Sequence, residues 1–157
     1  MSSGRNAVRM TEDEIADYLS DQMKVQVATL GPDGWPHLTT LFYVYTEGQI
    51  AFWTYGRSQK VLNIGRDDRV TLLVESGDDY DQLRGVSIQG RAKLVTEYDD
   101  IVRIGAGVVR RMTGGADLGE FGDQIVAAQA KKRVGVVIEP TRVMSWDHSK
   151  MTAPPGA

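Results

Sequence analysis

The chain has 157 residues, no cysteine, and 18 basic against 21 acidic side chains, for a formal net charge of −3. This length suits one domain with a real core, and the lack of cysteine excludes disulfides, thiolate catalysis and cysteine-ligated metal. The slight acidity argues against a nucleic-acid binder, and no apolar run is long enough to cross a bilayer. We therefore expect neither nucleic acid nor a membrane as a partner. Because the first six residues lack the apolar core of a signal peptide, we expect a cytoplasmic protein.

The first half of the chain predicts a helix followed by antiparallel strands. Thr11 and Glu14 have the spacing of a capping box, so a short amphipathic helix should begin there. Polar and apolar residues then alternate, and Gly31-Pro32-Asp33-Gly34 supplies strong turn chemistry, which predicts a hairpin. Three strands are expected in succession, over 24–30, 36–45 and 49–54.

The second half predicts more strands and two further helices. The expected strands cover 70–75, 85–96, 134–139 and, as an extension of the sheet, 142–146. Gly90 inside a strand pattern suggests a bulge or bend, and Pro140 should end the strand before it. The acidic pair at 99–100 can cap a helix that Gly114 stops, and another helical stretch is expected over 118–132.

Six or seven strands with short connections and three flanking helices argue for an α+β domain, mainly β, built on a small antiparallel barrel. A doubly wound parallel sheet is disfavoured, because the early turns leave no room for crossover helices. We expect one domain over 1–157, with a core at 11–146 and a C-terminal tail at 147–157 that ends in a mobile Pro-Pro-Gly segment.

The stretch 51–64 is where the sequence indicates a binding site. An apolar strand breaks at Gly56 and is followed by Arg57, Ser58 and Lys60. If a helical turn begins at Ser58, its free backbone N–H groups point at the same bound oxygen atoms as the two cations and the hydroxyl. A phosphate fits this chemistry, and an ordinary N-capped helix with solvated charges explains the same residues equally well.

Four segments occur in an order and spacing that are specific together: Ala28–His37, Arg57–Ile64, Arg84–Ala92 and Ser145–Lys150. Over about 11–150 the chain resembles the split β-barrel superfamily of pyridoxamine-phosphate oxidases, and more closely its flavin- and deazaflavin-dependent oxidoreductases. The resemblance implies a split β-barrel fold and a homodimer with the cofactor site at the subunit interface. The aromatic residues between 42 and 55 are candidates for burial in that interface or in the barrel interior.

The resemblance also implies which residues bind the cofactor. Arg57, Ser58 and Lys60 look like the residues that grip its phosphate, with Asn63 holding the loop or adding a contact. Four further residues look like those whose backbone and side chains touch its ring: Thr39, Thr40, Thr54 and Tyr55. For the threonines, plain β-propensity on a pleated surface is the competing explanation.

Two cofactors compete for such a site, FMN and the deazaflavin coenzyme F420, and both carry a phosphate beyond a tricyclic ring. The segments 57–63 and 145–150 resemble the F420 branch, so we expect an F420-dependent oxidoreductase that transfers hydride to a conjugated small molecule. The alternatives are an FMN-binding oxidoreductase of the same fold and a non-catalytic flavin or deazaflavin carrier. No catalytic triad or metal site is expected, and His37 or His148 is a candidate proton donor.

Overall fold

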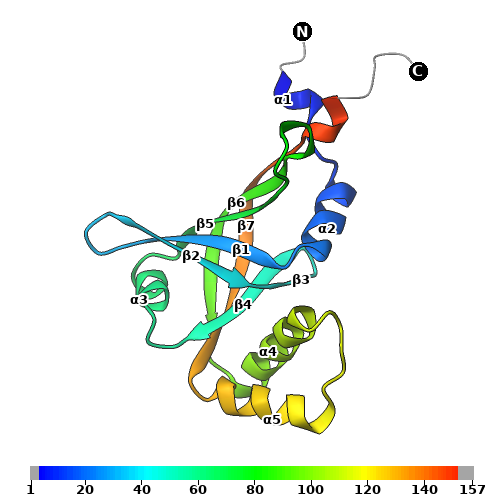
Figure 1. The fold of residues 1–157 in the computed structure, drawn as a ribbon. Helices are drawn as coiled ribbons and strands as arrows, with labels where there is room; N and C mark the ends of the chain where they lie inside the picture. Colours follow the sequence, from blue (N-terminus) through cyan, green and yellow to red (C-terminus); the bar gives the residue numbers. More distant parts are fainter. Residues whose placement is uncertain (1–3, 152–157) are drawn as a thin grey trace.

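The computed structural model describes residues 4–151, and its centre is one seven-stranded antiparallel sheet that curls into half of a barrel (Figure 1). The strands are β1 (Lys24–Leu30), β2 (Pro36–Phe42), β3 (Val44–Thr46), β4 (Gln49–Tyr55), β5 (Arg69–Ser76), β6 (Arg84–Val95) and β7 (Arg133–Asp147). They lie in the order β2-β1-β5-β6-β7-β4-β3. The predicted mainly-β split barrel is therefore confirmed.

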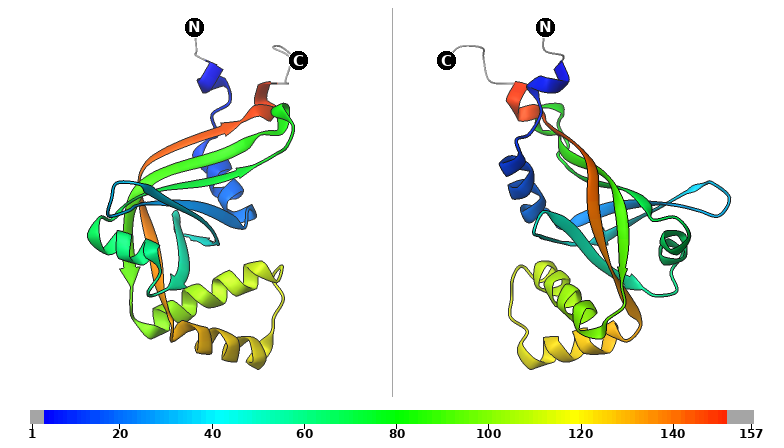
Figure 2. Two further views of the ribbon diagram at one scale, coloured as in Figure 1. Left: turned by 60° about the vertical axis from the view of Figure 1, so that its left-hand side comes forward. Right: turned by 180° about the vertical axis from the view of Figure 1, so that it is seen from behind.

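The described residues form five α-helices and two short 3-10 helices: α1 (Gly4–Ala7), α2 (Glu12–Asp21), α3 (Gln59–Arg66), α4 (Tyr98–Met112), α5 (Gly119–Ala130), η1 (Tyr80–Gln82) and η2 (His148–Met151). Figure 2 shows α4 and α5 as a hairpin at one end of the sheet, with α1 and η2 together at the other end. None of these helices combines the length and apolarity that crossing a bilayer requires. The expected Pro-Pro-Gly tail lies outside the described residues.

The predicted capping box is present at the start of α2. The backbone N–H of Glu14 donates to Thr11 Oγ1 at 3.2 Å, and the backbone N–H of Thr11 donates to Glu14 Oε2 at 2.7 Å. The helix predicted to begin at the acidic pair 99–100 is α4, and its N-cap is Glu97, slightly earlier in the chain. Gly114 follows α4 with a φ of 66°, which glycine adopts more readily than other residues. The predicted stop is therefore correct.

Two strand boundaries differ from the prediction. The expected strand over 36–45 is interrupted at Tyr43, whose backbone N–H donates to Met23 O and whose hydroxyl donates to Leu19 O at 2.6 Å. Pro140 does not end a strand, since β7 continues through it to Asp147. Its missing N–H is tolerated because β4 pairs with β7 only from 133 to 138, and a register shift lies opposite, at Gly90. The predicted bulge at Gly90 is thus confirmed.

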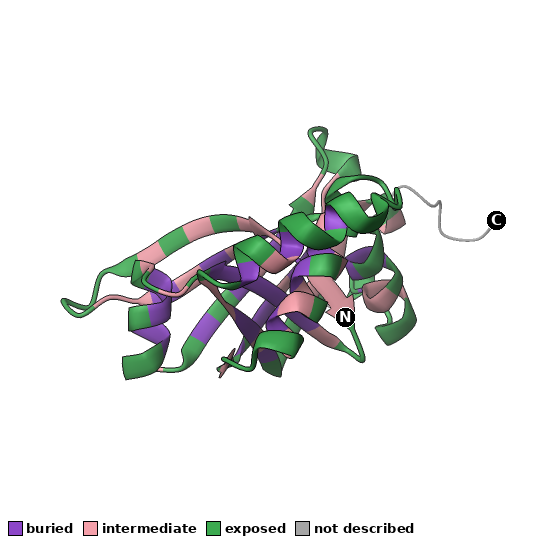
Figure 3. Cartoon of the chain, turned by 90° about the horizontal axis from the view of Figure 1, so that it is seen from below, coloured by how far each residue is buried: buried purple, intermediate pink, exposed green. Residues whose placement is uncertain are grey.

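The apolar residues form two clusters, one inside the curled sheet and one between β4 and the α4–α5 hairpin. Figure 3 shows the buried positions alternating with exposed ones along the strands. Tyr43 and Phe52 belong to the first cluster, and Phe42 and Trp53 pack in the second. Most aromatic residues between 42 and 55 therefore fill the cores of this chain, and Tyr55, which is 54% exposed, is the exception.

Candidate functional site

The predicted cationic cluster lies where β4 ends and α3 begins. The backbone N–H of Gly56 donates to Lys132 O at 3.0 Å, which ties the loop to the start of β7. Ser58 is the N-cap of α3, its backbone is extended, and its hydroxyl makes no capping bond. The helix start expected at Ser58 is present. The N–H of Val61 already donates to Ser58 O at 3.1 Å, so the first-turn N–H groups left for a ligand are those that precede Val61.

Lys60 is the buried cation of this cluster. Its residue is 8% exposed, and its ammonium donates to Thr54 Oγ1 at 3.3 Å. Within residues 4–151, no carboxylate forms an ion pair with it, and burial lowers the pKa of its ammonium. An unneutralised buried cation favours an anionic ligand, because a bound anion offsets the cost of desolvating the charge.

Three buried side-chain atoms near α3 or on β2 lack a hydrogen-bond partner in the part of the chain that the structure describes: Ser58 Oγ, Thr39 Oγ1 and His37 Nδ1. Buried polar atoms in folded proteins are normally paired, so such atoms are candidates for contact with a ligand. Together with Lys60 they supply the cation and the hydrogen-bonding groups that a phosphate-bearing flavin-type cofactor needs. The residues present therefore fit that class of cofactor.

Asn63 uses its side chain inside the protein. It is fully buried, its Nδ2 donates to Thr29 Oγ1 at 3.0 Å, and its Oδ1 accepts from Gln59 Nε2 at 2.8 Å. Arg66 also donates to Asn63 Oδ1, at 3.3 Å. The bond to Thr29 holds α3 against β1. Of the two roles that the resemblance implied for Asn63, holding the loop or contacting the cofactor, this arrangement corresponds to the first. Arg57, by contrast, is exposed, and no partner for its side chain lies in the described residues.

The two predicted ring-contacting pairs are each split by the alternation of a strand. Thr39 lies on the same side of β2 as the partly buried residues, whereas Thr40 is exposed on the other side. Thr54 is buried and bonded to Lys60, whereas the Tyr55 ring lies 4.3 Å from the Arg133 guanidinium. The structure therefore groups Thr54, Ser58 and Lys60, and directs the side chains of Thr40 and Tyr55 to the opposite faces of their strands.

Arg133 is a neighbour that sequence reasoning missed. Its guanidinium also lies 4.8 Å from the Trp53 ring centroid, so it is held between two aromatic side chains. Strand pairing places Arg133 opposite Tyr55, although the two residues are far apart in the chain. No local motif signals such a contact, since it depends on the register of β4 against β7.

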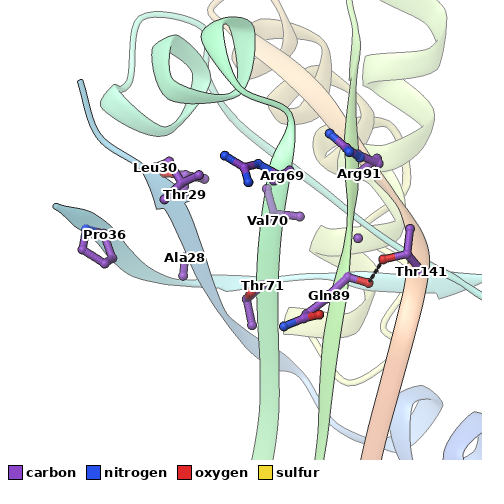
Figure 4. A pocket seen from close by; sticks show the side chains of 11 residues that line it. Ala28, Thr29, Leu30, Pro36, Arg69, Val70, Thr71, Gln89, Arg91 and Thr141 are labelled. Atoms are coloured by element: carbon purple, nitrogen blue, oxygen red, sulfur yellow. Dashed lines mark hydrogen bonds between the residues drawn. The ribbon is translucent and has the colours of Figure 1, made fainter. Parts of the chain in front are cut away.

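A cavity that was not predicted lies on the outer face of the sheet. It has a volume of about 590 Å³ and is lined by residues of β1, β5, β6 and β7, together with Pro36 (Figure 4). Arg69 and Arg91 lie at its border, but each is ion-paired, with Asp67 at 2.7 Å and Asp68 at 2.6 Å. None of the residues Arg57, Ser58 and Lys60 lines it. The buried Lys60 and this cavity are thus at different places.

In the described residues, no group of three or more His, Cys, Asp or Glu side chains is arranged to hold a metal ion.

His148, one of the two candidate proton donors, is bonded within the protein. Its Nδ1 lies 2.8 Å from Tyr80 O, and the centroids of the two rings are 4.7 Å apart.

The curled antiparallel half-barrel defines a split-barrel protein, with a buried lysine that has no ion pair in the described residues at the start of α3. Residues 11–147 match the sequence profile of pyridoxamine 5'-phosphate oxidase, and the chain belongs to this family. No curated protein matches the sequence.

Several solved structures share the fold. The conserved hypothetical protein Rv2991 from Mycobacterium tuberculosis is 41% identical, with a TM-score of 0.89 over 99% of this chain and 96% of that one. An F420 reductase is 22% identical, with a TM-score of 0.62 over 81% of this chain and 93% of that one. A FAD-binding protein from Mesorhizobium loti is 16% identical, with a TM-score of 0.65 over 87% and 94% of the two chains. The last two similarities concern the fold alone.

Proposed function

We propose that this chain is an F420-dependent oxidoreductase that reduces a conjugated small molecule, with the cofactor phosphate at Lys60. The observation that carries the proposal is Lys60, a buried residue in the first turn of α3 whose ammonium has no ion pair in the described residues. Ser58, two residues earlier, has a buried hydroxyl without a partner. Such a group fits a permanent anion. The resemblance of segments 57–63 and 145–150 to the F420 branch favours the deazaflavin, and FMN is the alternative cofactor.

The proposed roles follow from the positions of the side chains. Lys60, Ser58 and the exposed Arg57 would hold the phosphate, while Asn63 keeps α3 in place through its bond to Thr29. A reduced deazaflavin, when bound, supplies a hydride for a polarised double bond. The protein then contributes position and exclusion of water, and no dedicated catalytic side chain is required.

The test is a titration of the purified protein with F420 and with FMN, followed by Lys60→Ala and Arg57→Ala. Each loses a charge-assisted contact worth about 1.5–3 kcal/mol, or roughly ten- to a hundredfold in affinity. Lys131→Ala, which removes an exposed cation at the end of α5, is the matched control and should change little. Unchanged affinity in both site variants would show that the phosphate binds elsewhere.

We also propose that the chain is a cytoplasmic homodimer whose second copy covers the outer face of the sheet. That face holds the 590 Å³ hollow, and Leu38 on β2 and Met144 on β7 are 65% and 48% exposed. Exposed apolar side chains on a sheet face favour burial against another protein surface. Leu38→Asp should therefore lower the molar mass measured by light scattering from two chains to one, with little change in the far-UV spectrum.

A non-catalytic carrier of the same cofactor is the competing function. Steady-state reduction of a panel of conjugated acceptors by the protein with reduced F420 separates the two. Turnover that is lost in Lys60→Ala supports the enzyme. Tight binding without turnover of any acceptor supports the carrier.

A further inference from the structure

The segment that precedes α2 is anchored along the C-terminal part of β7. Val8 O accepts a hydrogen bond from the backbone N–H of Asp147 at 2.7 Å, and the backbone N–H of Met10 donates to Ser145 Oγ at 3.1 Å. The side chains of Val8 and Met10 are buried. Figure 2 shows α1 beside the end of β7, away from the α4–α5 hairpin. The segment 5–9 is therefore a fixed wall next to β7.

A cavity of about 530 Å³ lies between this wall and residues 142–146 of β7, and three arginines line it: Arg5, Arg9 and Arg142. None of the three guanidinium groups has an ion pair or a hydrogen-bond partner in the part of the chain that the structure describes. No acidic side chain lines the cavity, and two carboxylates of the adjoining elements, Glu14 and Asp147, already pair with other cations. In a chain whose net charge is −3, this is a local excess of positive charge.

Apolar side chains line the β7 side of the same cavity. Val143 and Met144 are 42% and 48% exposed, and Trp146 borders the same space. Trp146 pairs in register with Gly85 of β6, and a Cβ atom at Gly85 would overlap the indole ring. Glycine at this position lets the ring lie against the backbone of β6, which holds the ring at the border of the cavity. Unpaired cations and an apolar surface thus face one space.

This combination selects the chemistry of a ligand. A guanidinium binds a carboxylate through two parallel hydrogen bonds, and apolar side chains are stabilised when a carbon skeleton covers them. The volume of the cavity lies within the usual range of small-molecule sites. Inorganic phosphate would leave the apolar side uncovered, and a neutral hydrocarbon would leave the arginines without a counterion. A ligand with both parts suits both sides of the cavity.

We propose that this cavity binds a small organic carboxylate with a flat apolar body, such as an aromatic acid. Arg9 and Arg142 hold its carboxylate, one from each wall, and Val143 and Trp146 cover its ring. No residue of α3 or β2 lines the cavity, so this ligand is separate from the cofactor of the proposed function.

The experiment titrates the full chain with naphthoate by isothermal calorimetry, with two comparison ligands. Naphthamide has the same ring without the charge, and acetate has the charge without the ring, so each should bind about tenfold or more weakly than naphthoate. Arg9→Gln and Arg142→Gln should each weaken naphthoate about five- to twentyfold and leave naphthamide unchanged. Arg103→Gln, which removes an exposed arginine on α4, is the control and should leave naphthoate affinity unchanged.

Two further measurements separate this site from the cofactor site and from a contact between two chains. Saturating FMN should leave naphthoate affinity unchanged. Because Met144 also lies on the face proposed for the second copy, light scattering of the arginine variants should give the molar mass of the original protein.

The inference is overturned if naphthoate does not bind, if naphthamide or acetate binds as tightly, if the arginine variants do not weaken naphthoate, or if FMN displaces it. It is also overturned if the arginine variants change the molar mass, because a second copy then occupies the cavity. Should the FMN titration of Lys60→Ala fail instead, the proposed function falls and this site stands.

Discussion

Two polar clusters of this molecule each contain a lysine, a serine and a histidine, but they differ in how many hydrogen bonds these side chains make. At the C-terminal end, Lys150 donates to Glu14 at 2.6 Å and to Arg9 O at 2.8 Å. At the start of α3, the longer 3.3 Å contact with Thr54 Oγ1 is all that the Lys60 ammonium makes with the described residues.

The serine and histidine of each cluster repeat the contrast. Ser149 Oγ donates to Asp147 at 2.6 Å, and His148 is bonded to Tyr80. Ser58 Oγ and His37 Nδ1 are both unpaired among the described residues. The C-terminal cluster joins η2 to α2, to Arg9 before α2 and to η1, and its polar groups are bonded within the protein, as in a structural cluster. The α3 cluster leaves bonds unmade, which is the condition that a ligand site requires.

The largest effect on stability is expected from Asn63, the one member of the α3 cluster that is fully bonded. Asn63→Ala leaves the buried Thr29 without its hydrogen-bond donor, removes the acceptor of Gln59 and empties a fully buried position, so it should lower the free energy of unfolding by about 2–4 kcal/mol. Chemical denaturation measures it. Gln59→Ala, which removes an exposed partner of the same bond, should cost about 1 kcal/mol or less. Equal losses in the two variants would mean that Asn63 does not hold α3.

The two lysines should respond to the same substitution with opposite signs. Lys60→Met removes a buried, unneutralised charge and should stabilise the unliganded protein by about 1–2 kcal/mol. Lys150→Met breaks two bonds and should destabilise it by about 1 kcal/mol. Denaturation of both variants in one buffer is the measurement. A loss of stability in Lys60→Met would place Lys60 with the structural cluster.

Affinity for an anion should depend on alkaline pH through Lys60. Burial lowers the pKa of this ammonium below its ordinary value of 10.5, so it loses its proton earlier than an exposed lysine as pH rises. The charged form binds the phosphate, so FMN affinity should fall by up to about tenfold as pH rises through the lowered pKa. In Lys60→Arg, whose charge persists, the decline should disappear. If FMN affinity still declines with pH in Lys60→Arg, the titration of a group other than Lys60 causes the decline.

The smallest effect is expected at Asp67, where a charge is already paired. Hydrogen bonds from the Arg69 side chain and backbone lower the pKa of Asp67 from 3.8 to about 2. A carboxyl group whose pKa is lower in the folded than in the unfolded protein stabilises the fold at pH values above its ordinary pKa. That stabilisation is lost as the pH falls toward 2. Melting temperatures of the original protein and Asp67→Asn should therefore differ slightly at pH 7 and converge near pH 2. A constant difference at every pH would refute the ion-pair origin.

Local rules predicted much of the fold. The Thr11–Glu14 capping box, the bulge at Gly90 and the stop at Gly114 each depend on a few neighbouring residues. The rule that proline ends a strand failed at Pro140, because it depends on whether a second strand needs the missing N–H, and β4 has already ended there. The extent of pairing between strands cannot be read from one of them.

For the site, too, the sequence predicted what local patterns determine and missed what depends on distant residues. The break from strand to helix located Arg57, Ser58 and Lys60, but nothing local distinguishes the buried Lys60 from the exposed Arg57. The partner of Asn63 is Thr29, 34 residues away, so its structural role appears only in the folded chain. The period-two alternation of a strand was a usable signal, since adjacent residues such as Thr39 and Thr40 must project from opposite faces of any strand that contains both.

Tyr43 has a consequence for how relatives of this chain can vary in length. It joins β2 and β3, which are neighbours in the chain but occupy the two opposite margins of the sheet. Its fully buried ring and its bond to Leu19 fix the point where the chain crosses over. An insertion there would separate the margins and open the curl, whereas the exposed connection at 113–118 has room to lengthen. Length variation among homologues should therefore gather at the α4–α5 connection and be absent around Tyr43.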